Sequence, residues 1–231
     1  MIHDLNTPAR RAPSRCLMGV MLLLAMTALS SPRAAEGFFI GDSIAAATAQ
    51  TIGMRGSAHH SVSLRRNAIA PQFQRIPKGA VALMTLGLND AAIPVQAMRK
   101  DIELVIEGAL KTGEKVVWIG PPCVLKSWDK RAKEMDDYLH ERLATTAIQY
   151  VSLRDPQICR PGMRSGDGEH FTDAGYRYIW QKIRQDSTYA AEVDWPMRTQ
   201  PIGASTAPRA SHKKSRRDSH LWNASSTAQR L

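Results

Sequence analysis

Three short groups of residues in this sequence carry side chains of the kinds used in acyl transfer. The first is the Gly-Asp-Ser tripeptide that ends at Ser43, the second surrounds Asn89, and the third contains Asp167 and His170. A serine hydroxyl is a weak nucleophile until a base takes its proton, and histidine can be that base near neutral pH. Asp167, three residues before His170, could hold the imidazole in one tautomer, and the Asn89 amide could donate to an oxyanion. Together these residues predict a serine nucleophile with a histidine base.

Ser43 on its own has a second interpretation. It lies between an apolar run at 37–41 and an alanine-rich segment at 43–53, which is the pattern of a strand turning sharply into a helix. Serine is favoured at the start of a helix, where its hydroxyl accepts a hydrogen bond from a backbone amide that lacks a partner. From these residues alone, Ser43 is either a nucleophile or an ordinary helix cap.

The elements that would position these residues alternate along the chain. Short, almost continuously apolar runs are typical of strands buried on both faces of a parallel sheet. Between them lie segments with apolar residues at spacings of three and four, which predict amphipathic helices. The predicted strands are residues 37–41, 80–87, 115–120 and 148–153, and the predicted helices are residues 43–53, 97–113, 127–146 and 172–183. This order predicts an α/β fold, a three-layer αβα sandwich.

Two details of these helices are specific enough to test. In residues 97–113 the apolar stripe runs to Leu110, which is therefore expected to face the core. In residues 127–146, Ser127 is a plausible N-cap. Because ligands bind at the carboxyl ends of strands in such sheets, the three chemical groups are expected to meet at one edge.

The two ends of the chain differ from the middle in composition. Residues 1–35 have basic residues followed by an apolar stretch and then small residues, which indicates a secretory signal peptide, with a retained N-terminal anchor as the alternative. Residues 36–187 are expected to form the globular domain. Residues 188–231 are basic and rich in Ser, Thr, Ala and Pro, which predicts a disordered tail. Most of the formal net charge of +10 lies in the two ends, so it is no argument for nucleic-acid binding by the domain.

The cysteines and histidines show no spacing typical of a metal site, and we expect neither a metal nor a cofactor. Once a signal peptide is removed, Cys123 and Cys159 remain. Each follows a predicted strand, so both would lie at the same edge, close enough for a disulfide in an oxidising compartment. Such a bridge would brace the loop that bears the aspartate and histidine or serve only as a structural staple, and two free buried thiols are the alternative.

The blocks "GDS", "GLND" and "DGEHFTDAGY" resemble blocks I, III and V of the SGNH hydrolase superfamily, the GDSL-like lipases and esterases, over residues 37–183. The resemblance implies a flavodoxin-like parallel sheet of about five strands. It implies Ser43 as nucleophile and oxyanion donor, Asn89 as second donor, His170 as base and Asp167 as the residue that orients it. The remaining residues of the first two blocks that match the motifs are Gly41, Asp42, Gly87 and Asp90.

One feature of that superfamily is missing. Its block II has a glycine whose backbone amide completes the oxyanion hole, and the matching stretch, residues 61–73, contains no glycine. The expected position falls at about Arg65 or Arg66. Any residue except proline can supply an amide, but an arginine side chain there would narrow the pocket or charge it in favour of an acidic substrate. Equally, both arginines could be solvated.

These observations predict an exported serine hydrolase, periplasmic or secreted, that cleaves carboxylic esters. Short acyl esters and O-acetyl groups on envelope or extracellular polysaccharide are the expected substrates. The alternative is a weak or inactive module of the same fold that binds acylated or acidic glycans. We expect a monomer with no specific nucleic-acid partner, whose basic tail makes at most weak contact with anionic envelope surfaces.

Overall fold

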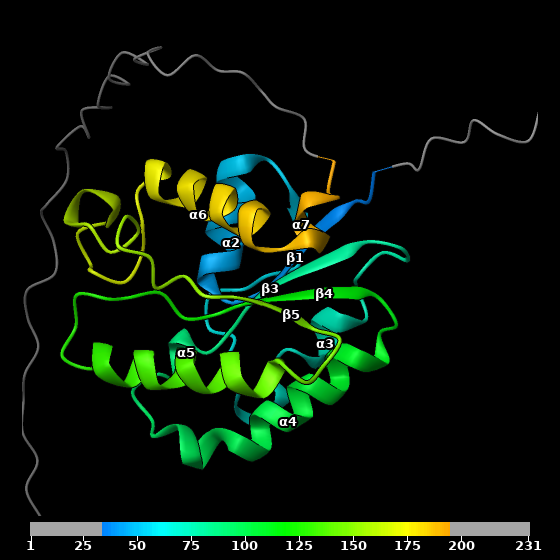
Figure 1. The fold of residues 1–231 in the computed structure, drawn as a ribbon, viewed down its shortest axis with the longest axis horizontal. Helices are drawn as coiled ribbons and strands as arrows, with labels where there is room; N and C mark the ends of the chain where they lie inside the picture. The colour runs from blue at the N-terminus through cyan, green and yellow to red at the C-terminus, as the bar shows by residue number, and fades with distance from the viewer. Residues whose placement is uncertain (1–33, 195–231) are drawn as a thin grey trace, which may run out of the picture. The chain divides into compact units, whose positions relative to one another are not determined.

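A computed structural model describes residues 34–194 of the chain, which form a five-stranded sheet covered by helices (Figure 1). The strands are all parallel and lie in the order β2-β1-β3-β4-β5. Their bounds are β1 Gly37–Gly41, β2 Arg55–Gly56, β3 Val81–Thr85, β4 Lys115–Ile119 and β5 Gln149–Val151. The predicted α/β class and strand number are confirmed.

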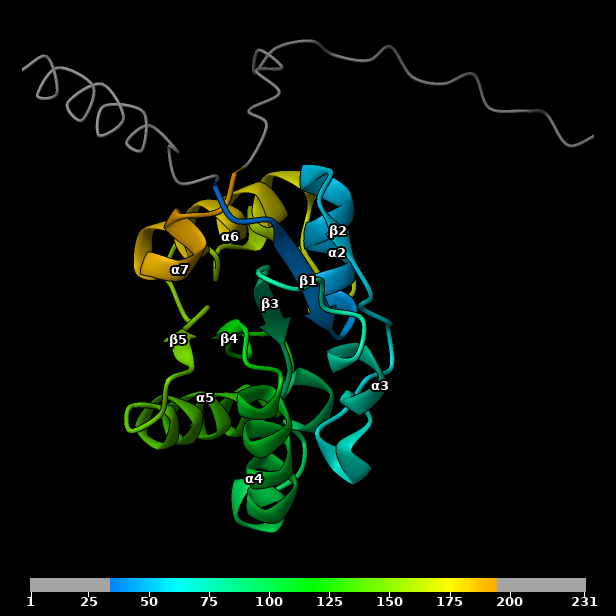
Figure 2. The same cartoon turned by 90° about the vertical axis from the view of Figure 1, so that its right-hand side faces the viewer.

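Helices cover both faces of this sheet. The α-helices are α2 Ser43–Ile52, α3 Ala70–Phe73, α4 Val95–Lys111, α5 Asp129–Leu143, α6 Asp173–Asp186 and α7 Thr188–Ala191. Three short 3-10 helices are η1 Arg65–Asn67, η2 Leu88–Asp90 and η3 Pro161–Met163. Figures 1 and 2 show α2, α6 and α7 on one face and α3, α4 and α5 on the other. The fold is therefore the three-layer αβα sandwich that the alternation of elements predicts.

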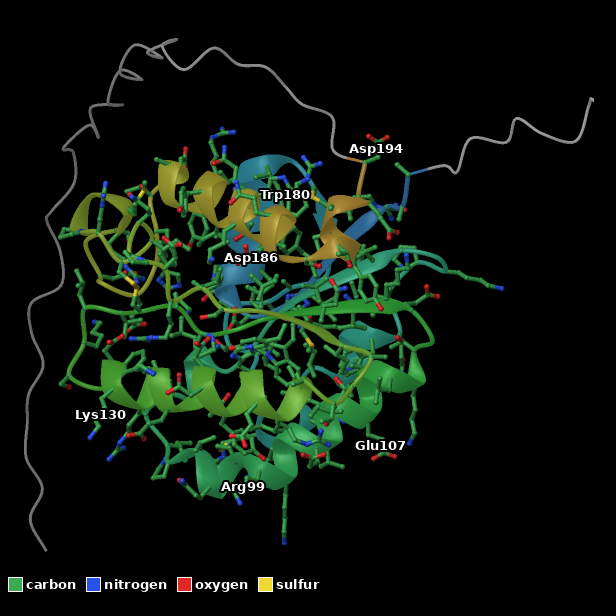
Figure 3. All side chains as sticks on the ribbon, viewed as in Figure 1. Arg99, Glu107, Lys130, Trp180, Asp186 and Asp194 are labelled. Carbon is green, nitrogen blue, oxygen red and sulfur yellow. A yellow bond between two sulfur atoms is a disulfide. The ribbon has the colours of Figure 1, made fainter. Side chains whose placement is uncertain are left out.

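The central strands are apolar along their whole length because both of their faces are covered. Every residue of β1 and β3 is buried, and successive side chains enter opposite core layers. Phe39 packs edge-on against Trp180 of α6, with ring centroids 6.1 Å apart, whereas its neighbour Ile40 packs in the opposite layer. Trp180 is fully buried, whereas Arg99 of α4 and Lys130 of α5 are exposed (labelled in Figure 3).

Some local predictions are wrong, each for a physical reason. Leu110 is 45% exposed because it lies at the edge of the apolar stripe of α4, whose last buried residue is Ala109. Ser127 does not cap α5, whose N-cap residue is Trp128 with no side-chain hydrogen bond. β2 and α3 are too short to show a hydrophobic period, so the sequence did not reveal them.

The described fold extends beyond the expected domain boundary at residue 187. α7 is capped by the Ser187 side chain, which accepts a hydrogen bond from Ala190 N, and Val193 forms a parallel bridge with Ala35. Helix α7 is only four residues long, which is too short to show a recognisable hydrophobic pattern in the sequence. The predicted signal peptide lies almost wholly outside the described residues, as does the predicted tail from residue 195 onward. Between residues 34 and 194, no helix has the length and apolar character needed to cross a membrane.

Candidate active site

Ser43 lies at the sharp turn between β1 and α2, and the turn depends on close packing. Gly41 has φ +113°, and a Cβ atom there would lie 1.9 Å from the Thr85 carbonyl oxygen. Only glycine therefore fits at the end of β1. The turn brings the first residue of α2, Ser43, to the carboxyl edge of the sheet.

The residue that caps α2 is Asp42, not Ser43. Its Oδ1 accepts hydrogen bonds from Ile44 N at 3.0 Å and from Thr85 Oγ1 at 2.5 Å. Asp42 is completely buried, and the loss of solvation raises its pKa to about 6 even though these hydrogen bonds act in the opposite direction. Because Asp42 does the capping, the Ser43 hydroxyl is available for another partner, and the cap interpretation of Ser43 is wrong.

That partner is a histidine 127 residues further along the chain. Ser43 Oγ lies 2.9 Å from His170 Nε2, and His170 Nδ1 lies 2.6 Å from Asp167 Oδ2. Asp167 and His170 lie on the loop between η3 and α6, and Ser43 lies on the first turn of α2. The structure thus brings the three predicted residues into one hydrogen-bonded chain, in the order that proton transfer from serine to histidine requires.

The Asp167 carboxylate is fixed by its own loop. Its Oδ1 accepts hydrogen bonds from Ser165 Oγ at 2.7 Å, Glu169 N at 2.8 Å and His170 N at 2.9 Å. Partial burial acts to raise the pKa of Asp167, but the two backbone amides and the side-chain partners outweigh it and hold the pKa well below its usual range. Asp167 is therefore ionised at neutral pH, as a residue that orients an imidazole must be.

Asn89 lies in η2, which begins directly after Gly87. The φ of +113° at Gly87 allows the chain to turn after β3. The Asn89 side chain is exposed, and its Nδ2 donates to the carbonyl oxygens of Val62 at 2.8 Å and His60 at 3.3 Å. Asn89 therefore contacts a tight turn formed by residues 59–62, after β2.

This turn carries backbone amides that have no partner. It is closed by a hydrogen bond from Val62 N to the His59 carbonyl, which leaves His60 and Ser61 at its centre. Within residues 34–194, the amides of His60, Ser61 and Ser43 donate no hydrogen bond. They are candidate donors to a bound oxyanion, next to the side chain of Asn89.

The amides of Arg65 and Arg66, where the sequence placed the missing block II donor, are used elsewhere. Arg65 N donates to Ser63 Oγ at 3.0 Å, and Arg66 N donates to Asp101 Oδ1 on α4 at 3.1 Å. Both arginines are exposed. Neither amide is therefore free to bind an oxyanion, and the tight turn after β2 lies earlier, at residues 59–62.

Two buried polar residues hold these loops on the sheet. Asp90 accepts from Ser63 Oγ at 2.5 Å and Leu64 N at 2.7 Å, and its burial raises its pKa. Gln72 brackets the end of β1, since its Oε1 accepts from Gly41 N at 2.5 Å and its Nε2 donates to Gly41 O at 3.2 Å. The sequence reasoning missed Gln72, and no local pattern marks a single buried glutamine in a four-residue helix.

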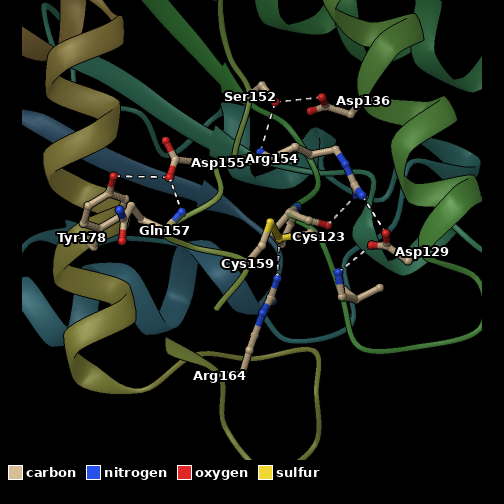
Figure 4. Close-up of a disulfide and its surroundings, with 12 residues drawn as sticks. Cys123, Asp129, Asp136, Ser152, Arg154, Asp155, Gln157, Cys159, Arg164 and Tyr178 are labelled. Carbon is tan, nitrogen blue, oxygen red and sulfur yellow. Dashed lines mark hydrogen bonds and ion pairs between the residues drawn. A yellow bond between two sulfur atoms is a disulfide. The ribbon is translucent and has the colours of Figure 1, made fainter. Parts of the chain in front are cut away.

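The loops after β4 and β5 are joined by the predicted disulfide between Cys123 and Cys159, with Cα atoms 5.7 Å apart (Figure 4). Nearby, Arg154 Nη2 donates to Asp129 Oδ2 at 2.7 Å, which ties the end of β5 to the start of α5. Within residues 34–194, no group of three His, Cys, Asp or Glu side chains is arranged to hold a metal ion.

Comparison with solved structures identifies the fold of this chain. No protein-family model matches the sequence, and no curated protein matches it. A GDSL-like lipase from Bacteroides thetaiotaomicron has 16% identity, covers 72% of this chain and 95% of its own, and gives a TM-score of 0.53. A carbohydrate esterase of family 3 from Talaromyces cellulolyticus has 16% identity, covers 64% and 94%, and gives 0.53. An extracellular lipase from Streptomyces rimosus has 13% identity, covers 67% and 100%, and gives 0.55. The chain therefore has the fold of the SGNH hydrolases, the superfamily of GDSL-like lipases and esterases that its sequence blocks resemble.

Proposed function

We propose that this protein is a serine esterase that cleaves carboxylic esters through Ser43, His170 and Asp167. The observation that carries the proposal is the continuous hydrogen-bonded chain from Ser43 Oγ to His170 and on to Asp167, at 2.9 and 2.6 Å. A serine that merely capped a helix would have no reason to face a histidine whose other ring nitrogen is held by an ionised carboxylate.

In the proposed reaction, His170 Nε2 takes the proton from Ser43 Oγ as the oxygen attacks the ester carbonyl. The imidazolium that forms is stabilised by Asp167, whose low pKa keeps it negatively charged. His170 then gives the proton to the departing alcohol, leaving an acyl group on Ser43. A water molecule, activated by the same histidine, releases the acid and restores the serine.

The tetrahedral oxyanion would be bound by three kinds of donor. Ser43 N stands at the start of α2, where the helix dipole also favours negative charge. Asn89 Nδ2 would exchange its longer contact, 3.3 Å to the His60 carbonyl, for the oxyanion while keeping the 2.8 Å contact to Val62. The amide of His60 or Ser61 would take the place of the block II glycine. Each such donor is worth about 3–4 kcal/mol in the transition state.

For the substrate, we propose short acyl esters and in particular O-acetyl groups on envelope or extracellular polysaccharide. A carbohydrate esterase shares the fold, which supports this class. We further propose that the protein is exported to the periplasm or beyond and acts as a monomer. The disulfide fits an oxidising compartment, and the basic residues after 195 would at most hold it near anionic envelope surfaces.

A second candidate, a module that binds acylated or acidic glycans without cleaving them, is favoured by one observation. The Asn89 side-chain nitrogen, Nδ2, already donates to two backbone carbonyls, of His60 and Val62. If these contacts persist with ligand bound, the oxyanion loses one of its donors and turnover is slow.

The test is hydrolysis of p-nitrophenyl acetate and labelling by a fluorophosphonate probe, with the full chain, Ser43→Ala, and Ser127→Ala as the matched control. Ser127 is exposed and caps no helix, so its variant should behave as wild type. We expect turnover and labelling in wild type, with both lost in Ser43→Ala, a fall in kcat of about 10⁴-fold or more. Folded wild-type protein that neither turns over nor labels would leave the binding module as the better explanation.

A further inference from the structure

Arg164 is a buried arginine directly before the loop that carries Asp167 and His170. Only 6% of its surface is exposed, and its guanidinium carbon lies 4.2 Å from the centroid of the Phe171 ring. Within the described part of the chain, no carboxylate forms an ion pair with it and its Nε has no hydrogen-bond partner. Burying a cation without a salt bridge costs free energy, which its hydrogen bonds and its contact with Phe171 must offset.

Those contacts join the disulfide to the loop. Arg164 Nη2 donates to Cys123 Sγ at 2.9 Å, and Nη1 donates to the carbonyl oxygen of Glu169 at 3.3 Å. Figure 4 shows the arginine side chain extending from its loop to the disulfide between Cys123 and Cys159. The guanidinium therefore connects a covalent cross-link of the β4 and β5 loops with the backbone just before His170.

The peptide group between Glu169 and His170 is held at both ends. Its carbonyl accepts the hydrogen bond from Arg164, and its N–H donates to Asp167 Oδ1 at 2.9 Å. The orientation of this peptide plane sets the direction in which the His170 side chain leaves the backbone. A loss of the contact on the carbonyl side would let the plane rotate and carry the imidazole away from Ser43.

The rest of the loop is held at its ends and on one flank. Ser165 N donates to the His170 carbonyl at 2.9 Å, and Leu125 N donates to the Gly168 carbonyl at 2.8 Å. The side chains of Asp167 and His170 remain 50% and 35% exposed, so solvent does not restrain them from outside. Arg164 adds a side-chain contact from the buried side of the loop.

We propose that Arg164 is a positioning residue for the Ser43–His170–Asp167 chain, and that the disulfide supports the site through it. The inference rests on the proposed esterase function for its kinetic readout only. Burial lowers the pKa of Arg164 to about 10, so the guanidinium stays charged at neutral pH and keeps both of its hydrogen bonds. A purely structural role, in which the side chain only fills space against Phe171, makes different predictions.

The experiment compares wild type with Arg164→Met and Arg164→Lys, using Arg160→Met as the matched control. Arg160 lies at the other end of η3, next to Cys159, but is exposed. Methionine keeps the length and the contact with Phe171 but removes both donors. We expect kcat for p-nitrophenyl acetate to fall about 10- to 100-fold in Arg164→Met with KM changed less than about twofold, because a misplaced base slows chemistry more than binding. Arg164→Lys, with one ammonium in place of the fork, should lie between wild type and Arg164→Met.

A second readout does not depend on activity. The NMR signals of the His170 ring nitrogens, assigned by their absence in His170→Gln, report whether Nδ1–H is still bonded to Asp167. We expect the low-field Nδ1 proton to broaden or vanish in Arg164→Met and to persist in Arg160→Met. If wild type lacks esterase activity the proposed function fails, and these signals still decide the role of Arg164.

The link to the disulfide is tested by the Cys123→Ala/Cys159→Ala variant with and without Arg164→Met. If the disulfide supports the site through Arg164, removing both should lower kcat no further than Arg164→Met alone, a non-additive result. Should Arg164→Met fail to fold, Arg164→Lys and the cysteine variant provide the same comparison. Unchanged kcat and unchanged His170 signals in a folded Arg164 variant, or fully additive losses, would overturn the proposal.

Discussion

The two halves of the proposed site are held in place in different ways. Ser43 is 5% exposed and sits on a turn whose backbone packs against β3, with Asp42 bonded to Thr85 and Gly41 touching it. His170 and Asp167 lie on an exposed loop after the last strand. Ser43 is thus positioned by the sheet itself, whereas His170 is positioned by hydrogen bonds within its loop and, in our proposal, by the disulfide through Arg164.

This difference determines how well each half of the site tolerates substitutions. The turn at Ser43 has no room for change, because its neighbours are backbone atoms of a central strand. The loop of His170 can tolerate side-chain changes at its surface but depends on long-range contacts that join it to the core. Damage to the turn should therefore affect folding, and damage to the loop's supports should affect local order and catalysis first.

The largest effect is expected at the turn. Gly41→Ala would place Cβ 1.9 Å from the Thr85 carbonyl oxygen at a φ of +113°. Because both overpacking and backbone strain are introduced, the free energy of unfolding should fall by about 4 kcal/mol or more. Urea denaturation followed by circular dichroism measures this loss in the free energy of unfolding.

The control for this variant is Gly53→Ala at the other end of α2. Gly53 also has a positive φ, +73°, but a Cβ there meets nothing within 4 Å. It should lose only about 1–2 kcal/mol from backbone strain. Equal losses at the two glycines would show that close approach to β3 is not what the turn requires.

The next effect concerns the cross-link behind the loop. Cys123 and Cys159 are 36 residues apart, so removing the disulfide by the double Ala variant should lower the free energy of unfolding by about 4 kcal/mol in the chain-entropy estimate. Hydrogen exchange should show the two halves separately. The amides of Glu169 and His170 should exchange faster, whereas those of Ile44 and Ala45, bonded to Asp42 and Thr85, should keep their protection. Equal acceleration at both places would show that the Ser43 turn and the His170 loop are not held independently.

The sequence predicts features that are encoded in short stretches, and it does not predict contacts between residues that are distant in the chain. Continuous apolar runs marked the four longer strands, because burial on both faces leaves a strong local pattern. The Gly-Asp-Ser turn and the Asp-x-x-His spacing likewise lie within short stretches. β2, with two exposed residues, leaves no pattern. Arg164 could not be found either, because its partners, Cys123 Sγ and a backbone carbonyl, become neighbours only in the fold.

A smaller effect is expected from Asp42, the buried carboxylate directly before Ser43. The pKa of Asp42 is raised from 3.8 to about 6, so in this pH interval the native state binds more protons than the unfolded state and stability falls as pH rises. Asp42→Asn keeps an oxygen acceptor for Ile44 N without the charge. It should stabilise the protein by up to about 3 kcal/mol at pH 8, with the gain gone below about pH 4. Denaturation curves of wild type and Asp42→Asn between pH 4 and pH 8 measure this difference in stability.

Asp167→Asn is the matched variant in the other half, and its sign is opposite. Because the native pKa of Asp167 is lowered, ionised Asp167 adds stability above the ordinary carboxyl pKa, and that contribution is lost as pH falls. The variant should therefore lose stability at neutral pH and approach wild type in acid. A gain at neutral pH in Asp167→Asn, or a pH-independent effect in Asp42→Asn, would contradict the assigned environments.

The smallest effect is expected at Arg66, which follows the turn at residues 59–62. Arg66 has φ +56° and ψ +26°, a left-handed conformation that costs a side chain about 1–2 kcal/mol, while glycine in the unfolded chain has about 0.5–1 kcal/mol more entropy to lose. Arg66→Gly should therefore stabilise the protein by up to about 1 kcal/mol. Because the Arg66 amide bonds Asp101 and its side chain is exposed, kcat/KM should stay within about twofold for both neutral and anionic esters. A selective loss with the anionic ester would show that Arg66 reads substrate charge after all. Unchanged kinetics would leave the free amides of His60 and Ser61 as the donors that this loop offers to the site.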